Sequence, residues 1–234
     1  MKKILLVAMI ASLCGAAFAA DDPKDDKDDT KAGGRLQASA TVLDEIMGTP
    51  DKAIPEEIMK SAECVAVVPS LLKAGFVVGA RYGRGVASCR TAKGWSAPAF
   101  FTVSGGSFGF QIGGQAIDLV MLVMNKDGVK NLLDSKFQLG ASASAAAGPV
   151  GRHAEGNTDW KMRAQVLTYS RARGLFAGVE LNGAVVKQDK DTTREFYSRM
   201  VPFKTLLNGM IDPPAGSKVF LDSLYKWSKQ AAGQ

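Results

Sequence analysis

Two neighbouring stretches, AGFVVGARYGRGVASCR (residues 74–90) and GWSAPAFFTVSGGSFGFQIGGQAIDLVMLVMN (residues 94–125), decide the fold of this chain. Both contain several valines and aromatic residues, and Gly or Pro interrupts them every few residues. Such runs, bounded by Gly or Pro, are typical of β-strands joined by turns. Together with the residues just before them, they predict strands at 64–69, 76–82, 86–90, 99–103, 108–112 and 117–124.

Helical patterns enclose this strand-rich region on both sides. Before it, apolar residues recur at helical spacing in 36–47, and Pro followed by two acids opens a second helix near residue 55. After it, further helices are predicted at 127–135, 192–200, 202–207 and 217–228, and further strands at 166–171, 175–181 and 184–187. The order predicts an α+β domain: an antiparallel sheet of many short strands, curled toward a barrel, with helices at both ends of the domain.

The beginning of the chain has the composition of a cleavable secretory signal peptide, which we assign to residues 1–19. Two lysines precede an apolar run at 4–13, and small residues follow that run. The run is shorter than the roughly 20 residues that span a bilayer, which argues against a membrane anchor. Lipidation at Cys14 is disfavoured because a leucine precedes the cysteine. We predict cleavage near Ala19/Ala20 and a periplasmic or secreted protein.

Charge is distributed unevenly along the mature chain. Residues 20–34 include DDPKDDKDDTKAGG, which lacks the apolar side chains of a core and predicts a disordered acidic leader. The net charge of +6 becomes +4 without Lys2 and Lys3, and residues 21–31, with six Asp and three Lys, contribute −3, which leaves +7 for the remainder. A basic body suits an acidic partner, and export argues against nucleic acid. No Pro/Ser-rich linker divides residues 35–234, so we predict one domain there.

Two cysteines, Cys64 and Cys89, remain after processing, and both lie in strand-like segments. An oxidising compartment permits a disulfide between them, worth about 3 kcal/mol in the chain-entropy description. Two buried thiols acting as small apolar side chains are the alternative. These cysteines and the single histidine, His153, lack the spacing of a zinc site, so we predict no metal.

No catalytic motif emerges from the chain. The glycines at 105–109 lack the lysine of a phosphate-binding loop. His153 lies in the polar stretch GRHAEGNTDW, and the chain has no G-x-S-x-G nucleophile elbow. We therefore predict a protein that is not an enzyme and needs no cofactor. A hydrolase with an unrecognised site is the enzymatic alternative.

Four long blocks of sequence closely resemble the SYLF domain family. They are the two stretches quoted above, then KFQLGASASAAAGPVGR (136–152) and YSRARGLFAGVELNGAVV (169–186), in the order of the family. The resemblance implies a lipid-binding domain, one that joins phosphoinositide or phosphatidic-acid membranes to the actin machinery in eukaryotes. It also implies an exported bacterial member, for which actin is not an expected partner. In eukaryotic members a basic amphipathic segment at the start of the domain contributes to membrane binding; the matching segment, Arg35–Met47, has one basic residue.

Cationic side chains at or near predicted turns are the candidate lipid-binding residues, because they are long enough to reach phosphate groups. They are Lys73, Arg81, Arg84, Arg90, Lys93, Arg152, Arg171 and Arg173. Arg81 and Arg84 flank Gly83, where we expect a tight turn that lets both converge on one phosphate. Trp95 and Phe101 fit either insertion at the head-group level or core packing.

The functional expectation is an exported phospholipid-binding protein whose basic surface contacts anionic head groups of the phosphoinositide or phosphatidic-acid type. Its expected partner is an anionic phospholipid membrane surface. A periplasmic structural or protein-interaction module, bound to an envelope protein, is the alternative.

Overall fold

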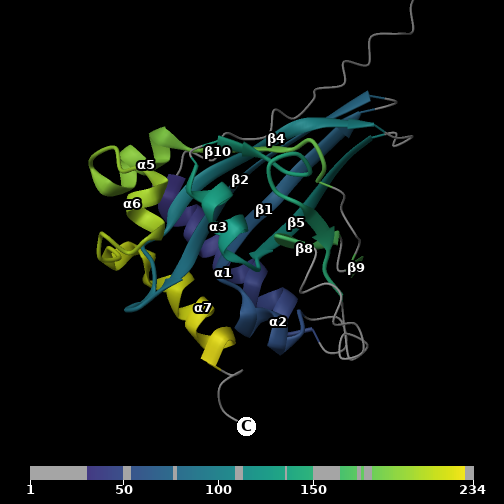
Figure 1. Ribbon diagram of the computed structural model, residues 1–234. Coiled ribbons are helices and arrows are strands. Elements are labelled where there is room, and N and C mark those ends of the chain that lie inside the picture. Colours follow the sequence, from purple (N-terminus) through teal and green to yellow (C-terminus); the bar gives the residue numbers. More distant parts are fainter. Residues whose placement is uncertain are drawn as a thin grey trace, which may run out of the picture.

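A strongly curled antiparallel sheet forms the centre of the structure, and helices cover both of its faces (Figure 1). The computed structural model describes residues 31–49, 54–75, 78–108, 113–134, 136–149, 164–172, 175–176 and 181–229. Within these residues the strand order is β6-β10-β4-β2-β1-β5-β8-β7, with β3 paired to β2 and β9 paired to β8. The predicted α+β fold with a curled sheet is confirmed. One pair departs from the antiparallel pattern, since β7 runs parallel to β8.

Four long strands carry the sheet, and shorter strands extend it on either side. The long strands are β1 (Cys64–Gly75), β2 (Val78–Thr91), β4 (Ala99–Phe108) and β5 (Gly113–Val123). The shorter ones are β3 (Gly94–Trp95), β6 (Lys136–Gln138), β7 (Ala145–Ala147), β8 (Val166–Ala172), β9 (Leu175–Phe176) and β10 (Val185–Gln188).

The strands predicted separately at 76–82 and 86–90 belong, from Val78 on, to the single strand β2, and glycine explains the difference. Gly83 and Gly85 lie inside β2 instead of ending a strand. A Cβ atom at Gly83 would come 2.6 Å from Val68 Cγ1, and one at Gly85 would come 2.5 Å from Phe101 Cζ. These glycines therefore permit close packing within a continuous strand and do not mark turns.

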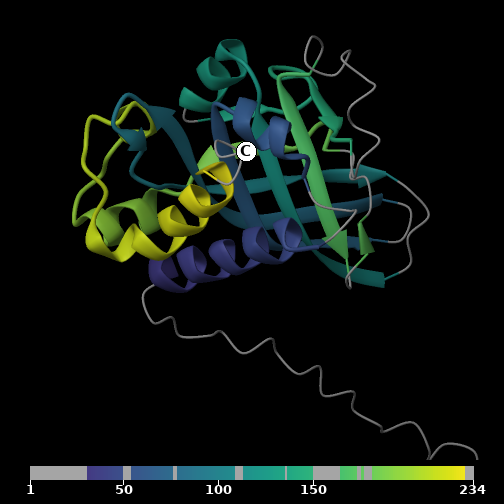
Figure 2. The same cartoon turned by 90° about the horizontal axis from the view of Figure 1, so that it is seen from below.

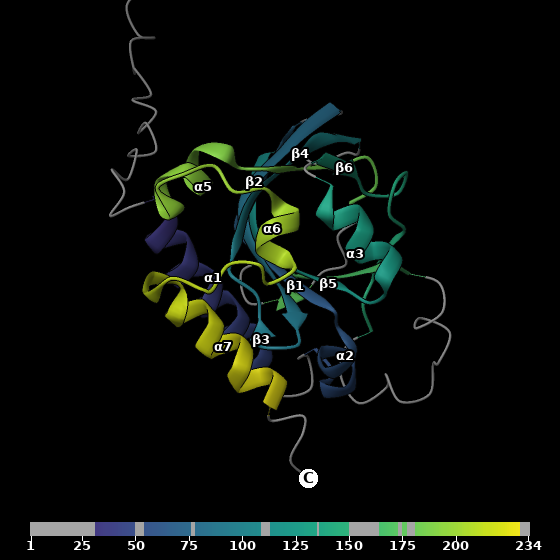
Figure 3. The same cartoon turned by 60° about the vertical axis from the view of Figure 1, so that its left-hand side comes forward.

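The two faces of the sheet carry separate apolar cores. We call the face covered by α1 and α7 the outer face, and the face against which α3 and α6 pack the inner face (Figure 3). Because successive side chains of a strand alternate, Phe100 lies in the outer core and its neighbour Phe101 in the inner core. Both are fully buried, as is Trp95 apart from 4% of its surface, so core packing is the correct reading for Trp95 and Phe101.

The helix α1 (Lys31–Met47) lies across the outer face, with α7 (Lys218–Lys229) beside it (Figure 2). The α1 helix begins four residues earlier than the predicted domain boundary at residue 35, and Ala32 is fully buried. Residues 31–34, which we assigned to the disordered leader, are therefore part of the folded domain. The rest of the leader and the signal peptide lie outside the described residues.

The remaining helices confirm the predicted helical segments. They are α2 (Glu56–Ser61), α3 (Lys126–Leu133), α5 (Lys190–Tyr197), α6 (Phe203–Leu207) and the 3₁₀ turn η2 (Ala215–Ser217) that leads into α7. Side-chain caps fix the start of two of them. The Asn125 side chain accepts a hydrogen bond from the backbone N–H of Gly128 in α3, and Asp189 accepts one from Thr192 in α5.

A disulfide joins Cys64 to Cys89, which resolves the alternative between a bridge and two free thiols. The two cysteines are direct cross-strand partners at the start of β1 and the end of β2, with Cα atoms 3.9 Å apart. Both side chains are buried in the inner core. The bond therefore fixes the register of the central strand pair as well as closing a loop.

We predict that replacing both cysteines, Cys64→Ala with Cys89→Ala, lowers the free energy of unfolding by about 3 kcal/mol, because the bond closes a loop with a sequence separation of 25 residues. Urea unfolding of both proteins, with and without reductant, measures the effect. Reductant should destabilise the unaltered protein and leave the double variant unchanged. Two free thiols titrated in the unfolded, unreduced protein would contradict the assignment.

Candidate functional site

Side chains of the outer face form rows that cross the central strands. The first row lies beneath α1 and is apolar: Phe100, Val86, Val67 and Val120 are register neighbours and are all fully buried. The next row, two residues along each strand, lies at the border of the helix and is polar. We call this second row, Lys187, Thr102 and Arg84, the middle row.

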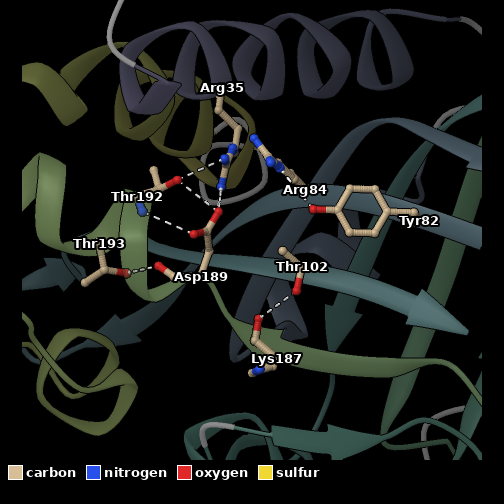
Figure 4. Close-up of polar contacts among 8 residues, drawn as sticks. All are labelled: Arg35, Tyr82, Arg84, Thr102, Lys187, Asp189, Thr192 and Thr193. Carbon is tan, nitrogen blue, oxygen red and sulfur yellow. Dashed lines mark hydrogen bonds and ion pairs between the residues drawn. The ribbon is translucent and has the colours of Figure 1, made fainter. Parts of the chain in front are cut away.

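The middle row places two cations on either side of a hydroxyl group. Thr102 on β4 is the register partner of Arg84 on β2 and of Lys187 on β10. Neighbouring strands are about 4.8 Å apart, so the Cα atoms of Arg84 and Lys187 are separated by roughly 10 Å. Arg84 Nε donates a hydrogen bond to Tyr82 Oη at 3.1 Å (Figure 4). Arg84 and Lys187 are both exposed.

A buried ion pair anchors α1 beside this row. Arg35 Nη1 lies 2.9 Å from Asp189 Oδ2, and these side chains are only 6% and 12% exposed. Arg35 Nη2 also donates to Thr192 Oγ1 at 3.2 Å, and the guanidinium lies 5.5 Å from the centre of the Phe100 ring. The pair joins the N-terminal part of α1 to the N-cap of α5 and brings Arg35 next to Arg84 (Figure 4).

The ion pair shifts the pKa values of both partners. Burial acts to raise the pKa of Asp189, but hydrogen bonds from Thr192 and Arg35, together with the charge of Arg35, outweigh it and lower that pKa. Burial lowers the pKa of Arg35; the hydrogen bond and charge of Asp189 oppose this effect, and the charge of Arg84 adds to it. Arg35 and Arg84 therefore repel each other, and Asp189 is the carboxylate that pairs with Arg35.

The opposite end of α1 has a different charge balance. Arg171 on β8 makes ion pairs with Glu45 of α1 and, at 3.2 Å, with Asp118 of β5. Hydrogen bonds and the charges of these two acids raise the pKa of Arg171 against the effect of burial. Its charge is thus matched by two carboxylates. The exposed cations Arg84 and Lys187 lie on β2 and β10 of the same face.

Arg81 and Arg84 do not converge, which corrects the expectation of a turn at Gly83. They are three residues apart in one continuous strand, so their side chains point to opposite faces. Arg84 is exposed on the outer face, whereas Arg81 is only 7% exposed. Arg81 donates two hydrogen bonds to the carbonyl of Gly106, from Nη2 at 2.7 Å and from Nε at 3.2 Å.

The other candidate cations lie at separate places. Lys73 is the register partner of Arg81, and burial together with the charge of Arg81 lowers its pKa. Arg90 lies 4.6 Å from the Trp95 ring and donates hydrogen bonds to two carbonyls at the end of α2. Lys93 lies in the turn after β2. Arg152 and Arg173 are outside the described residues, so Arg84 is the candidate that the structure places in the middle row.

Sequence reasoning missed the partners of Arg84. Arg35, Thr102 and the neighbouring residues Lys187 and Asp189 come from three segments of the chain, and only the strand register and the packing of α1 bring them together. One signal was available: Lys187 is the single cation in the predicted strand 184–187.

Within the described residues, no helix is long and apolar enough to cross a bilayer. In the same part of the chain, no group of three or more His, Cys, Asp or Glu side chains is arranged to hold a metal ion.

Comparisons with known proteins find relatives in animals and fungi. A profile of the Ysc84 family, described as "Las17-binding protein actin regulator", matches residues 104–227. Human SH3 domain-containing YSC84-like protein 1 is 33% identical over 210 residues, covering 89% of this chain and 61% of the human protein. LAS seventeen-binding protein 3 of Saccharomyces cerevisiae is 34% identical over 196 residues, covering 82% of this chain and 42% of the yeast protein. The chain thus spans only part of the length of these relatives.

We predict that Asp189→Asn lowers the free energy of unfolding by about 3–5 kcal/mol at neutral pH, because it leaves the buried charge of Arg35 uncompensated. The lowered pKa of Asp189 means that its carboxylate stabilises the fold above the ordinary Asp pKa of 3.8 and loses this effect as pH falls below it. The difference between the two proteins should therefore shrink in acid.

Urea unfolding from pH 7 down to pH 3 measures this difference. The matched control is Asp191→Asn, on the same helix but 96% exposed, which should have little effect at any pH. A difference between Asp189→Asn and the unaltered protein that stays constant over the whole range would show that Asp189 does not titrate as described.

Proposed function

The chain belongs to the Ysc84 family of SYLF domains, and from this premise we propose that it is an exported, non-enzymatic protein that binds anionic phospholipid head groups. The observation that carries the proposal is the middle row of the outer face. Arg84 and Lys187 are exposed on either side of Thr102, and Arg35 lies next to Arg84. This arrangement offers guanidinium and ammonium donors to a phosphate group, while the Thr102 hydroxyl between them donates to the backbone carbonyl of Lys187 at 3.4 Å.

The expected strength of binding follows from the number of cations. A cation near an anionic bilayer contributes about 1 kcal/mol, so two or three give attachment that is detectable and reversible. Such attachment is sensitive to salt, because the Debye length shrinks from about 10 Å at 0.1 M to about 3 Å at 1 M. The formal net charge of the mature chain, +4 once Lys2 and Lys3 are removed from the total of +6, adds a longer-range attraction in the same direction.

Two features support a location outside the cytoplasm. The beginning of the sequence has the lysines, apolar run and small residues of a secretory signal peptide. The disulfide between Cys64 and Cys89 is of a kind that persists in oxidising compartments and is rare in the cytosol. In a bacterial periplasm, the available anionic surface would be a phospholipid leaflet of the envelope.

A protein partner is the second candidate, and the names of the relatives favour it. The family description is "Las17-binding protein actin regulator", and the yeast relative is named as a LAS seventeen-binding protein. We propose for this chain only the general property, binding to another protein, since actin is not expected in the proposed compartment. This candidate predicts attachment to purified membranes that depends on their proteins and not on their lipid charge.

We predict that Arg84→Gln with Lys187→Gln weakens binding to vesicles of phosphatidylglycerol and phosphatidylcholine roughly thirtyfold at 0.1 M salt, because two contributions of about 1 kcal/mol are lost. Co-sedimentation with vesicles of graded anionic content measures the change. The control, Lys60→Gln with Lys204→Gln, removes the same net charge from exposed positions on α2 and α6 and should have a much smaller effect.

Equal binding of the unaltered protein to pure phosphatidylcholine vesicles, undiminished at 1 M salt, would overturn the proposed function. No binding to any protein-free vesicle, combined with binding to native membranes, would favour the protein partner instead.

We predict that deleting residues 21–30 tightens binding to the same anionic vesicles a few-fold. The deleted segment holds six Asp and two Lys, so it repels anionic head groups, and the deletion stops short of Lys31, where α1 begins. The gain should vanish at 1 M salt, where the Debye length is about 3 Å. Thermal unfolding serves as the control, since the midpoint should stay the same; weaker binding by the deletion variant would show that the leader takes part in attachment.

A further inference from the structure

We infer that Leu72 and Tyr82 form the part of the outer face that enters the head-group region of an anionic bilayer. The inference rests on the proposed function and names the surface that would perform it. Leu72 on β1 and Tyr82 on β2 are direct cross-strand partners. They lie one row beyond the middle row, and they are 56% and 45% exposed. We call this pair the apolar pair.

At this point of β1 and β2, the usual placement of apolar side chains inside and charged side chains outside is reversed. Leu72 and Tyr82 point to the outer face and are exposed, whereas the next pair along the same strands, Lys73 and Arg81, points to the inner face. In a domain whose surfaces meet only water, the cationic pair would face outward and the apolar pair inward. An exposed apolar pair beside a cationic row is the composition of a binding surface.

A β-bulge in β1 places Leu72 on the outer face, which Tyr82 reaches by the regular alternation of β2. On β5, Leu119 and Ile117 are two residues apart, whereas their partners on β1, Val68 and Leu71, are three residues apart. Ser70 has a φ of 53°, in the left-handed region, and its N–H donates to Asp118 Oδ1 at 3.1 Å. The extra residue shifts the alternation of β1, so that Leu72 faces outward.

Small side chains surround the apolar pair on the exposed side. The next row contains Ala74, Ala80, Gly106 and Gly114, which are register neighbours and all exposed. Leu72 and Tyr82 therefore project beyond the small side chains of this row. Two projecting apolar side chains beside exposed cations match a bilayer surface better than an extended or helical peptide, which docks into pockets or a groove.

The chemistry of the pair also suits the boundary between head groups and acyl chains. Tyrosine is enriched at this level of membranes, because its ring is apolar and its hydroxyl is polar. The Tyr82 hydroxyl accepts a hydrogen bond from Arg84, so the polar end of the ring lies with the cations of the middle row. Arg84 and Lys187 would meet phosphates while Leu72 and the Tyr82 ring enter between them.

Two measurements on the full mature protein test the inference. Leu72→Ser with Tyr82→Ser should weaken binding to phosphatidylglycerol-containing vesicles about tenfold, since partial burial of two apolar side chains is lost. This loss should persist at high salt, unlike the loss caused by neutralising Arg84 and Lys187. The control is Met210→Ser. Met210 is 65% exposed but lies away from the apolar pair: its neighbour Gly209, after α6, packs against Thr91 at the opposite end of β2.

The second measurement reports immersion directly. A cysteine introduced at Tyr82 or at Met210 is labelled with the environment-sensitive fluorophore NBD; Cys64 and Cys89, bonded to each other, do not compete. Emission should shift to the blue on anionic vesicles for the label at position 82 only. If the protein binds these vesicles while position 82 stays in water and Leu72→Ser with Tyr82→Ser has no effect, the inference is wrong and the proposed function stands.

Two further outcomes would also overturn the inference. Failure of the unaltered protein to bind anionic vesicles at all would overturn it together with the proposed function. Sedimentation velocity tests whether the apolar pair instead contacts a second copy of this chain. A dimer that is lost in Leu72→Ser with Tyr82→Ser, with unchanged vesicle binding, would assign the pair to that contact.

Discussion

The alternation of side chains along β1 and β2 is the constraint on which the rest of the structure depends. Both faces of these strands are used, so each residue is committed to the inner core, the outer core or the surface. One extra residue in β1 exchanges the faces of the β1 residues that follow it, Leu72 among them. The disulfide at one end and the bulge near the middle together fix the register, and the register decides which side chains form rows on the outer face.

The buried ion pair between Arg35 and Asp189 determines which charges lie beside those rows. It holds the start of α1 against α5 and leaves the middle row uncovered at the border of the helix. A buried ion pair contributes little net stability compared with an apolar substitute, so its value here is positional. It places a second guanidinium next to Arg84, whereas acids neutralise the opposite end of α1. Among the described residues, the two ends of α1 therefore differ in their ion pairs: Arg35 pairs with one acid, and Arg171 pairs with two.

The sequence was sufficient to predict the fold class and the family, since strand and helix patterns depend on neighbouring residues. The site was less predictable, because it depends on long-range register. Gly83 suggested a turn from its type alone, but the side chains of Val68 and Leu71 make it a packing position inside β2. The pairing of Thr102 with Arg84 and Lys187 joins three strands. No local pattern encodes this pairing, so Lys187 was not among the predicted site residues. Arg81 was also wrongly expected to converge with Arg84 on one phosphate.

Hydroxyl-radical footprinting of the unmodified protein tests most directly whether the far end of the outer face meets an anionic membrane. The exposed side chains of Leu72, Tyr82 and Met210 are all open to oxidation in the free protein. On phosphatidylglycerol-containing vesicles, the account predicts that oxidation of Leu72 and Tyr82 falls sharply while that of Met210 is unchanged. Bound protein in which Leu72 and Tyr82 stay as reactive as in solution would contradict it.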